Sequence, residues 1–260
     1  TLYDYSFRGP GLTVEEAGDI GSVRSSRTYY LELALGHDAI YLHAGGSPDA
    51  YDKIKAWSVT ALDCVNGPYE GSLYWRDRDR IKSAGYEHSV FTSGSKILEL
   101  FPTYRFRQEH EEGFTYGMTF TDDGAPAGGE SARIISVPFS NYKTGVFRYD
   151  LESGLYMVEQ YEKDYMDGNN GQQVGVTNVI VLKTACELIP GDDAGRLSVA
   201  LTGGGDGWYA CGGKLIPIKW SKVDRDSPFV YKTTDGRLLS LGRGTSYVSI
   251  IPLKNDISAQ

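Results

Sequence analysis

Residues 39–48, AIYLHAGGSP, predict a strand, a tight turn and the start of a helix. The first six of them form a short apolar run, which is typical of a strand. The two glycines then turn the chain. Ser47 is a good N-cap, and Pro48 suits the first helical position because its missing N–H has no partner there. We therefore expect a strand over 39–44 and a helix over 49–57.

Strand-like and helix-like runs alternate through the rest of the first half of the chain. Strands that alternate with helices favour a partly parallel sheet with helices packed on it. The other predicted elements are a strand over 2–6, a helix over 29–35 capped by Ser25 or Ser26 and ended by Gly36, a strand over 73–75, and a helix over 95–101 that Pro102 stops.

Beyond residue 130 the sequence consists mainly of strand-like runs separated by turn signals. The change comes at residues 122–129, DDGAPAGG, which have no hydrophobic periodicity and predict a linker. Turn signals such as 150–154 are typical of hairpins and favour antiparallel strands. We predict an α+β protein of two distinct units: an N-terminal α/β domain over 1–125 with a partly parallel sheet, and a C-terminal, mostly antiparallel β-rich domain over 130–260.

The composition excludes some classes of protein. The 260 residues carry 26 Lys and Arg against 34 Asp and Glu, and the net charge of −8 argues against a general nucleic-acid binder. No apolar run approaches the roughly 18–20 residues that span a bilayer, so we expect the chain to be soluble without a leader. The chain opens at Thr1 with no signal peptide. We expect an upstream segment to carry the targeting signal.

The cysteines Cys64, Cys186 and Cys211 are an odd set without C-x-x-C spacing. Neither a zinc site nor a disulfide framework is therefore indicated, and no metal or cofactor is expected. The favoured interpretation is that they are small buried apolar residues. One bridge, Cys64–Cys186 or Cys186–Cys211, is the alternative in an oxidising compartment.

Loops rich in arginine, histidine, serine and glycine follow the predicted strands of the first half. In open α/β sheets the loops at the carboxyl ends of parallel strands share one edge, where ligands usually bind. Helix N-termini at that edge offer free N–H groups, and arginine adds a bidentate fork for anions. We predict an anion-binding site formed by Arg24, Ser25, Arg27, His43, Gly45, Gly46, Ser47, Arg76, Asp77, Arg80, His88 and Ser93.

In this hypothesis the arginines clamp the anion, the glycines offer backbone N–H groups, and the histidines orient the ligand. Structural alternatives exist for each group. Arg24 and Arg27 can pair with surface carboxylates, His43 can be a satisfied structural histidine, and the residues from Arg76 to Arg80 can pair among themselves. Asp164, Asp167, Asn169 and Asn170 resemble part of a calcium loop, but the glutamate expected at its twelfth position is absent, which favours a β-turn.

The sequences of these loops resemble those of the YerB family. Its members are lipoproteins of Gram-positive bacteria, and each is built from paired domains of unknown function. The resemblance also covers the second half, and so nearly the whole chain. One run departs from the family pattern, since Glu87-His88-Ser89 stands where the family has a P-H-N-like sequence. The segments that carry the resemblance include 21–27, 38–48, 74–77, 139–140, 149–150, 177–181, 220–222 and 226–228.

The resemblance implies an exported protein that is anchored to the membrane by an N-terminal lipid, with no membrane contact otherwise. It implies no reaction. We expect a cell-envelope lipoprotein that binds an anionic ligand, either a wall component or a phosphorylated small molecule. The alternatives are a hydrolase or transferase at the same site, with His43 or His88 as general base oriented by Asp77, and a structural assembly factor without a ligand.

Overall fold

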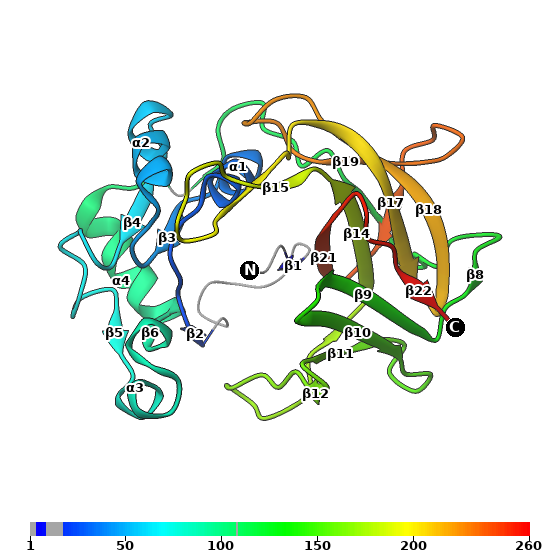
Figure 1. Ribbon diagram of the computed structural model, residues 1–260, viewed down its shortest axis with the longest axis horizontal. Helices are drawn as coiled ribbons and strands as arrows, with labels where there is room; N and C mark the ends of the chain where they lie inside the picture. Colours follow the sequence, from blue (N-terminus) through cyan, green and yellow to red (C-terminus); the bar gives the residue numbers. More distant parts are fainter. Residues whose placement is uncertain (1–3, 9–17, 108) are drawn as a thin grey trace. The chain divides into compact units, whose positions relative to one another are not determined.

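The computed structural model describes residues 4–8, 18–107 and 109–260, and the chain forms two compact units (Figure 1). The N-terminal unit comprises Leu12–Thr115 with Arg225–Pro228, and the C-terminal unit comprises Thr1–Gly11, Tyr116–Asp224 and Phe229–Gln260. This division differs from the predicted ranges 1–125 and 130–260. The first strand of the chain belongs to the C-terminal unit, which the chain enters again at Tyr116, and residues 225–228 belong to the N-terminal unit.

The N-terminal unit combines helices with two small sheets. Strands β3 and β4 form a parallel pair, and β2, β6 and β5 form an antiparallel sheet. The predicted α+β class and the partly parallel pairing in this half are confirmed. The elements are β2 (Asp19–Gly21), α1 (Thr28–Gly36), β3 (Tyr41–His43), α2 (Pro48–Ala56), β4 (Ala61–Asp63), β5 (Trp75–Arg76), α3 (Arg78–Ala84), the 3₁₀ helix η2 (Tyr86–His88), β6 (Val90–Ser93) and α4 (Gly94–Tyr104).

The strand, turn and helix predicted from residues 39–48 are confirmed. Ser47 is the N-cap of α2 and accepts a hydrogen bond from the Ala50 N–H, and Pro48 is the first residue of the helix. The predicted serine cap of α1 is wrong, because Arg27 occupies the N-cap position and makes no side-chain cap. Ser26 is instead held in a bridge with Gly46, which keeps it one residue outside the helix.

Helix α4 also differs from its prediction, since it continues past Pro102 to Tyr104 and ends at Arg105 in the left-handed region. The apolar side chains of Ile97 and Leu100 are buried in the core of the unit, which holds the helix in place through its last turns.

Asp38, after α1, fixes the segment that follows α4. Its carboxylate receives two hydrogen bonds from the Arg107 guanidinium and one, of 2.8 Å, from the Glu111 N–H, and it lies 3.2 Å from Nδ1 of His110. The hydrogen bonds from Arg107 hold the pKa of Asp38 well below its usual value. The chain after α4 is therefore attached to the unit through one carboxylate.

We expect Asp38→Asn to lower the free energy of unfolding by about 1–2 kcal/mol at neutral pH, since it removes charge-assisted hydrogen bonds. A lowered carboxyl pKa stabilises the fold above the unfolded pKa of about 4, and this contribution is lost as the pH falls further. The difference between wild type and variant should thus shrink at about pH 3. Denaturant unfolding at neutral pH and at about pH 3 measures this difference in stability. An equally large difference at about pH 3 would contradict the lowered pKa of Asp38.

The C-terminal unit is built from two larger sheets. Strand order is β1-β21-β14-β17-β18-β19 in the large sheet, with β8 on β18, and β12-β11-β10-β9-β22 in the smaller sheet, with β13 on β11. Most pairs are antiparallel, as predicted, and β14 with β21 is a parallel exception. The strands of these sheets are β1 (Asp4–Arg8), β8 (Glu130–Ser131), β9 (Ile134–Ser140), β10 (Lys143–Tyr149), β11 (Tyr156–Gln160), β12 (Lys163–Asp164), β13 (Gly175–Val176), β14 (Asn178–Thr184), β17 (Gly203–Cys211), β18 (Lys214–Lys222), β19 (Val230–Thr233), β21 (Thr245–Pro252) and β22 (Ser258–Ala259).

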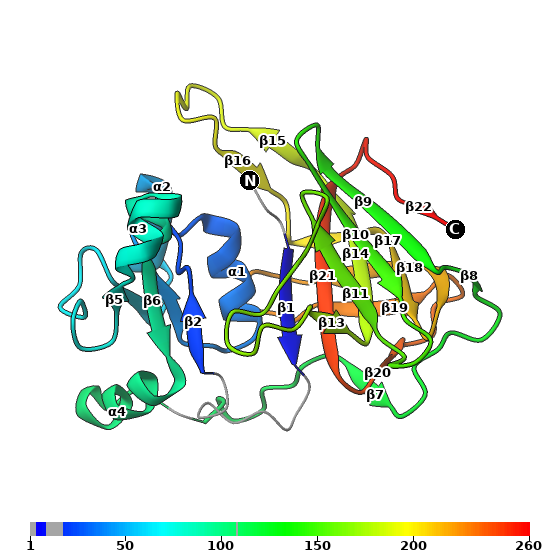
Figure 2. The same cartoon turned by 90° about the horizontal axis from the view of Figure 1, so that it is seen from below.

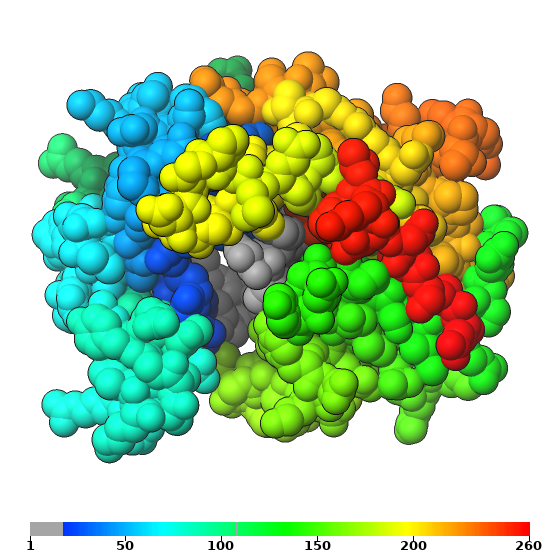
Figure 3. Space-filling view, viewed as in Figure 1, coloured from blue at the N-terminus to red at the C-terminus, as the bar shows by residue number. Residues whose placement is uncertain are grey.

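The core of this unit lies between the two sheets, whose strands lie beside each other in both views (Figures 1 and 2). Side chains of β9, β10 and β11 meet those of β14 and β21 there, among them Phe147, Val181 and Ile251. Strand β22, red in Figure 3, lies at the surface against the green strands of the smaller sheet. Two further pairs complete the unit: β7 (Thr119–Thr121) with β20 (Ser240–Gly242), and β15 (Cys186–Leu188) with β16 (Leu197–Val199).

The predicted strand over 2–6 is described from Asp4 onward, and its first two residues lie outside the described part of the chain. Residues 122–129 are not a linker between the units, because Gly124 and Pro126 are buried within the C-terminal unit. The lack of a side chain at Gly124 allows this close packing, since a Cβ there would lie 2.3 Å from Gly242 Cα.

Tyr209 and Asn178 fasten this segment to the large sheet. The Tyr209 hydroxyl lies 2.9 Å from Gly124 O and 2.9 Å from Oδ1 of Asn178, and it accepts a hydrogen bond from the Gly242 N–H. Asn178 in turn donates to Gly242 O and to Ser246 Oγ. Burial raises the pKa of Tyr209, so the hydroxyl stays protonated and connects three separate segments.

The three cysteines are free thiols. Cys64 and Cys211 are buried, as the favoured interpretation predicts, and Cys186 is partly buried. Burial raises the pKa of Cys64 to about 11. Residues 164–170, which resemble part of a calcium loop, contain a hydrogen-bonded turn. The Gly171 N–H closes it by donating to Asp167 O.

Candidate functional site

The parallel pair β3–β4 places His43 opposite Asp63 at the carboxyl ends of both strands. The Asp63 carboxylate accepts hydrogen bonds from the N–H groups of Gly45 and Val65, from the Tyr51 hydroxyl at 2.6 Å, and from Nδ2 of Asn66. Burial alone would raise the pKa of Asp63, but these hydrogen bonds hold it below its usual value. Burial and the neighbouring carboxylate raise the pKa of Tyr51 to about 12. Asp63 is thus a charged centre that organises the loop after β3.

His43 belongs to this buried cluster. Its side chain is 1% exposed, its Nδ1 lies 2.9 Å from Gly45 O, and its ring stacks on Tyr41. Since a carbonyl oxygen only accepts, Nδ1 carries a proton there. Nδ1 is also 3.8 Å from Asp63. These contacts agree with the structural alternative for His43, and its role in binding a ligand stays a prediction.

The glycines of the loop are also used internally. Gly45 adopts a φ of +73°, in the left-handed region, and its N–H donates to Asp63 instead of facing a ligand. A Cβ on Gly46 would lie 3.3 Å from the Tyr51 ring. The loop therefore needs glycine to close over Asp63 and Tyr51. Sequence reasoning missed both of these residues, although Asp63 ends an apolar run much as His43 does.

Three of the four predicted arginines hold one short turn. Arg76 donates to Tyr86 O, Arg24 to Glu87 O and Arg80 to His88 O, at 3.1, 2.8 and 3.2 Å. The three acceptors are the consecutive carbonyl groups of η2. Arg24 and Arg80 thereby satisfy two carbonyl groups at the end of this short helix, whereas Tyr86 O also accepts from the Ser89 N–H.

The remaining contacts of these residues are also internal. Arg76 pairs with Glu70 and lies over the Tyr86 ring, 3.7 Å from its centroid. Asp77 caps α3 by accepting from the Arg80 N–H, so it does not have the arrangement predicted for orienting a histidine. Three arginines of the predicted clamp thus have partners within the described part of this unit, and the clamp itself stays a prediction.

Two further predicted residues, Ser93 and Arg27, lie at helix starts. Ser93 caps α4 and accepts from the Lys96 N–H. Arg27 donates to Ser26 O at 2.7 Å.

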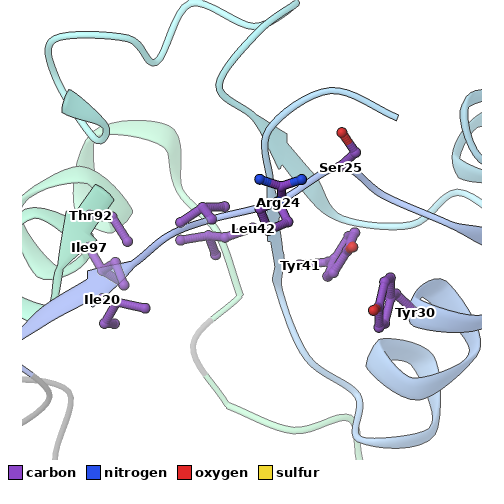
Figure 4. Close-up of a pocket in the computed structure, with 9 residues that line it drawn as sticks. Ile20, Arg24, Ser25, Tyr30, Tyr41, Leu42, Thr92 and Ile97 are labelled. Carbon is purple, nitrogen blue, oxygen red and sulfur yellow. The ribbon is translucent and has the colours of Figure 1, made fainter. Parts of the chain in front are cut away.

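A pocket of about 440 Å³ opens in the N-terminal unit (Figure 4). Of the predicted site residues, Arg24 and Ser25 line it. The Nη1 atom of Arg24 donates to Glu87 O and lies 2.6 Å from Nδ1 of His88, which places the guanidinium between η2 and the pocket. The other lining residues were missed by the sequence analysis because they come from separate elements: Ile20, Val23, Tyr30, Tyr41, Leu42, Thr92 and Ile97.

Comparison with known proteins places the sequence in a family. The model described as "Protein of unknown function (DUF3048) N-terminal domain" matches residues 11–107, and the model of the C-terminal domain of the same family matches residues 135–248. The chain belongs to the DUF3048 family. The family resemblance inferred from the sequence is thereby confirmed, and the pocket lies within the N-terminal DUF3048 domain.

A relative of this DUF3048 chain is the Bacillus subtilis protein named "Putative lipoprotein YerB", which is 27% identical over 238 residues, 90% of this chain and 67% of the relative. The crystal structure of YerB from Bacillus subtilis matches the fold with a TM-score of 0.77 at 24% identity, covering 93% of this chain and 78% of that one. Among the described residues of the DUF3048 chain, no helix has the length and apolar character needed to cross a membrane.

Proposed function

We propose that the N-terminal unit binds a small ligand that combines an apolar body with one anionic group. The observation that supports this is the pocket itself, in which the Arg24 guanidinium stands beside apolar walls. Pockets of a few hundred Å³ with apolar walls and few polar groups are typical of small-molecule sites.

The walls favour an apolar or ring-shaped ligand body. Ile20, Leu42 and Ile97 line one part of the pocket, and the rings of Tyr30 and Tyr41 lie at another (Figure 4). Two polar lining groups are already engaged, since Thr92 donates to Leu73 O and Ser25 to Ala44 O. The polar recognition therefore depends mainly on Arg24.

Arg24 has the donors that an anion needs. Among the described residues, the guanidinium of Arg24 makes its hydrogen bonds through Nη1. A guanidinium carries five N–H groups, so Nε and Nη2 remain to bind a carboxylate or phosphate in the usual forked geometry. In a protein with a net charge of −8, this local positive charge also favours an anion over a cation.

The name of the Bacillus relative supports an extracytoplasmic protein held to the membrane by a lipid anchor. Ligands of the proposed chemistry in that compartment are wall fragments with a phosphate or carboxylate, and phosphorylated small molecules are the second choice. Binding is favoured over hydrolysis because His43 is buried and Asp77 is engaged as a helix cap.

We expect Arg24→Gln to weaken ligand binding at least tenfold, since each lost charged hydrogen bond costs about 1.5–3 kcal/mol. Arg80→Gln is the matched control: Arg80 also donates to a carbonyl group of η2, but it does not line the pocket. The probes are phenyl phosphate, muramyl peptides and hexose phosphates, each of which joins a ring to an anionic group, titrated against the full chain by NMR.

The expected result is that one probe class shifts signals of Tyr30 and Tyr41, that Arg24→Gln abolishes those shifts, and that Arg80→Gln binds as wild type does. Equal weakening by both variants would show that the effect comes from loosening η2, and would overturn the proposal. A wild-type protein that responds to none of the three probe classes would overturn it as well.

A further inference from the structure

A second pocket, of about 360 Å³, lies in the C-terminal unit on the large sheet. Its lining comes from β14, β17 and β18, which are neighbours in that sheet (Figure 2), and from Leu253 after β21. The side chains that decide its chemistry are Lys183, Asp206, Trp208 and Pro217.

Trp208 and Pro217 form an apolar platform in this pocket. They are directly opposite each other in the register of β17 and β18, and residues so placed project from the same face of a sheet. Val181 is opposite Trp208 on the other side and is buried in the core. The indole is thus supported by the core on one side, while Pro217 beside it is exposed.

The geometry of β18 explains why a proline fits there. On the edge away from β17, this strand pairs with β8 at residues 214–215 and with β19 at residues 218–221. Among the described strands, residues 216 and 217 pair with β17 alone. A proline is tolerated at such a gap because it has no N–H to donate.

The charges beside the platform are balanced. Lys183 lies 3.4 Å from Asp256, and Asp206 pairs with Lys219. The Lys183 ammonium also lies 5.3 Å from the centroid of the Trp208 ring. The pocket lining holds one ammonium group, of Lys183, and one carboxylate, of Asp206, and each is already paired with a neighbour of opposite charge. The arrangement favours an uncharged ligand that both donates and accepts hydrogen bonds.

We propose that this pocket binds a neutral carbohydrate. A sugar ring presents an apolar C–H face, which packs on the platform of Trp208 and Pro217, and hydroxyl groups at its edge. These hydroxyls donate to the Asp206 carboxylate and accept from the Lys183 ammonium. Aromatic side chains with a few convergent polar groups are the usual composition of such a site. The proposal is independent of the N-terminal pocket.

The test is a titration of the full chain with neutral tetrasaccharides of glucose and of N-acetylglucosamine. Binding is monitored by NMR through the indole N–H signals of the four tryptophans. The signal of Trp208 should shift at millimolar sugar, and that of Trp220, which is 3% exposed, should not. A tetrasaccharide of uronic acids should bind at least fivefold more weakly. A Trp208 signal that no neutral sugar moves, or that the uronic acid moves equally, would overturn the proposal.

Two variants separate binding from folding. Asp206→Ala removes both acceptor oxygens of an exposed side chain and should weaken sugar binding at least fivefold without changing the melting temperature. Tyr142→Ala, which removes a 90% exposed aromatic side chain elsewhere in the same unit, should bind as wild type does. If Asp206→Ala retains full affinity, the hydroxyl contact and the proposal with it are wrong.

Discussion

Replacing Asp63 with alanine is expected to lower the free energy of unfolding of the N-terminal unit by about 3–5 kcal/mol, because each buried donor left without an acceptor costs about 1–3 kcal/mol. The variant leaves the N–H groups of Gly45 and Val65 and the Tyr51 hydroxyl without their acceptor. Hydrogen exchange of the Cys64 amide, which bonds His43 O between the two parallel strands, measures the loss in the full chain.

Asp77→Ala is the control for this prediction, because Asp77 is also an acidic side chain that accepts from a backbone N–H, but it caps only α3. Loss of a cap costs about 1 kcal/mol. If Asp63→Ala destabilises the unit no more than Asp77→Ala does, the carboxylate is not the centre of the loop.

Tyr209→Phe should lower the stability of the C-terminal unit by about 2–3 kcal/mol, because it leaves buried polar groups without a partner. The hydroxyl contacts Gly124 O, Asn178 Oδ1 and the Gly242 N–H, and the phenylalanine ring fills the same space. Denaturant unfolding at neutral pH measures the change.

Tyr149→Phe is the matched control in the same unit. Tyr149 packs its ring on the core, and its hydroxyl makes no hydrogen bond with the described residues. Its replacement should change the stability by at most about 0.5 kcal/mol. Equal effects of the two variants would show that the Tyr209 hydroxyl does not join the three segments.

The sequence allowed the local structure to be predicted where neighbouring residues determine it. The strand, turn and helix at 39–48 depend on an apolar run, two glycines, a capping serine and a proline, all within ten residues. The strand-rich second half was predicted for the same reason. The family was also recognised from short sequence motifs. These motifs do not show which residues contact one another in the folded chain.

The candidate site depended on contacts between distant residues, which the sequence does not reveal. Arg24 meets Glu87 and His88 because β2 pairs with β6, more than sixty residues along the chain. Arginine donors bind backbone carbonyl groups as well as anions, so residue type alone could not separate the two partners. The segment 122–129 was misread as a linker because the approach of Gly124 to Gly242 is likewise a long-range contact.

The gap beside Pro217 also bears on whether copies of this chain can associate through the edges of their sheets. An unpaired strand edge is a template on which a strand of another molecule can add, and such addition leads to aggregation. The gap in β18 lies between two partners that cover the rest of the edge. Proline at this position denies an incoming strand a hydrogen-bond donor. One residue can therefore protect the edge of the largest sheet while contributing its ring to the surface of a pocket.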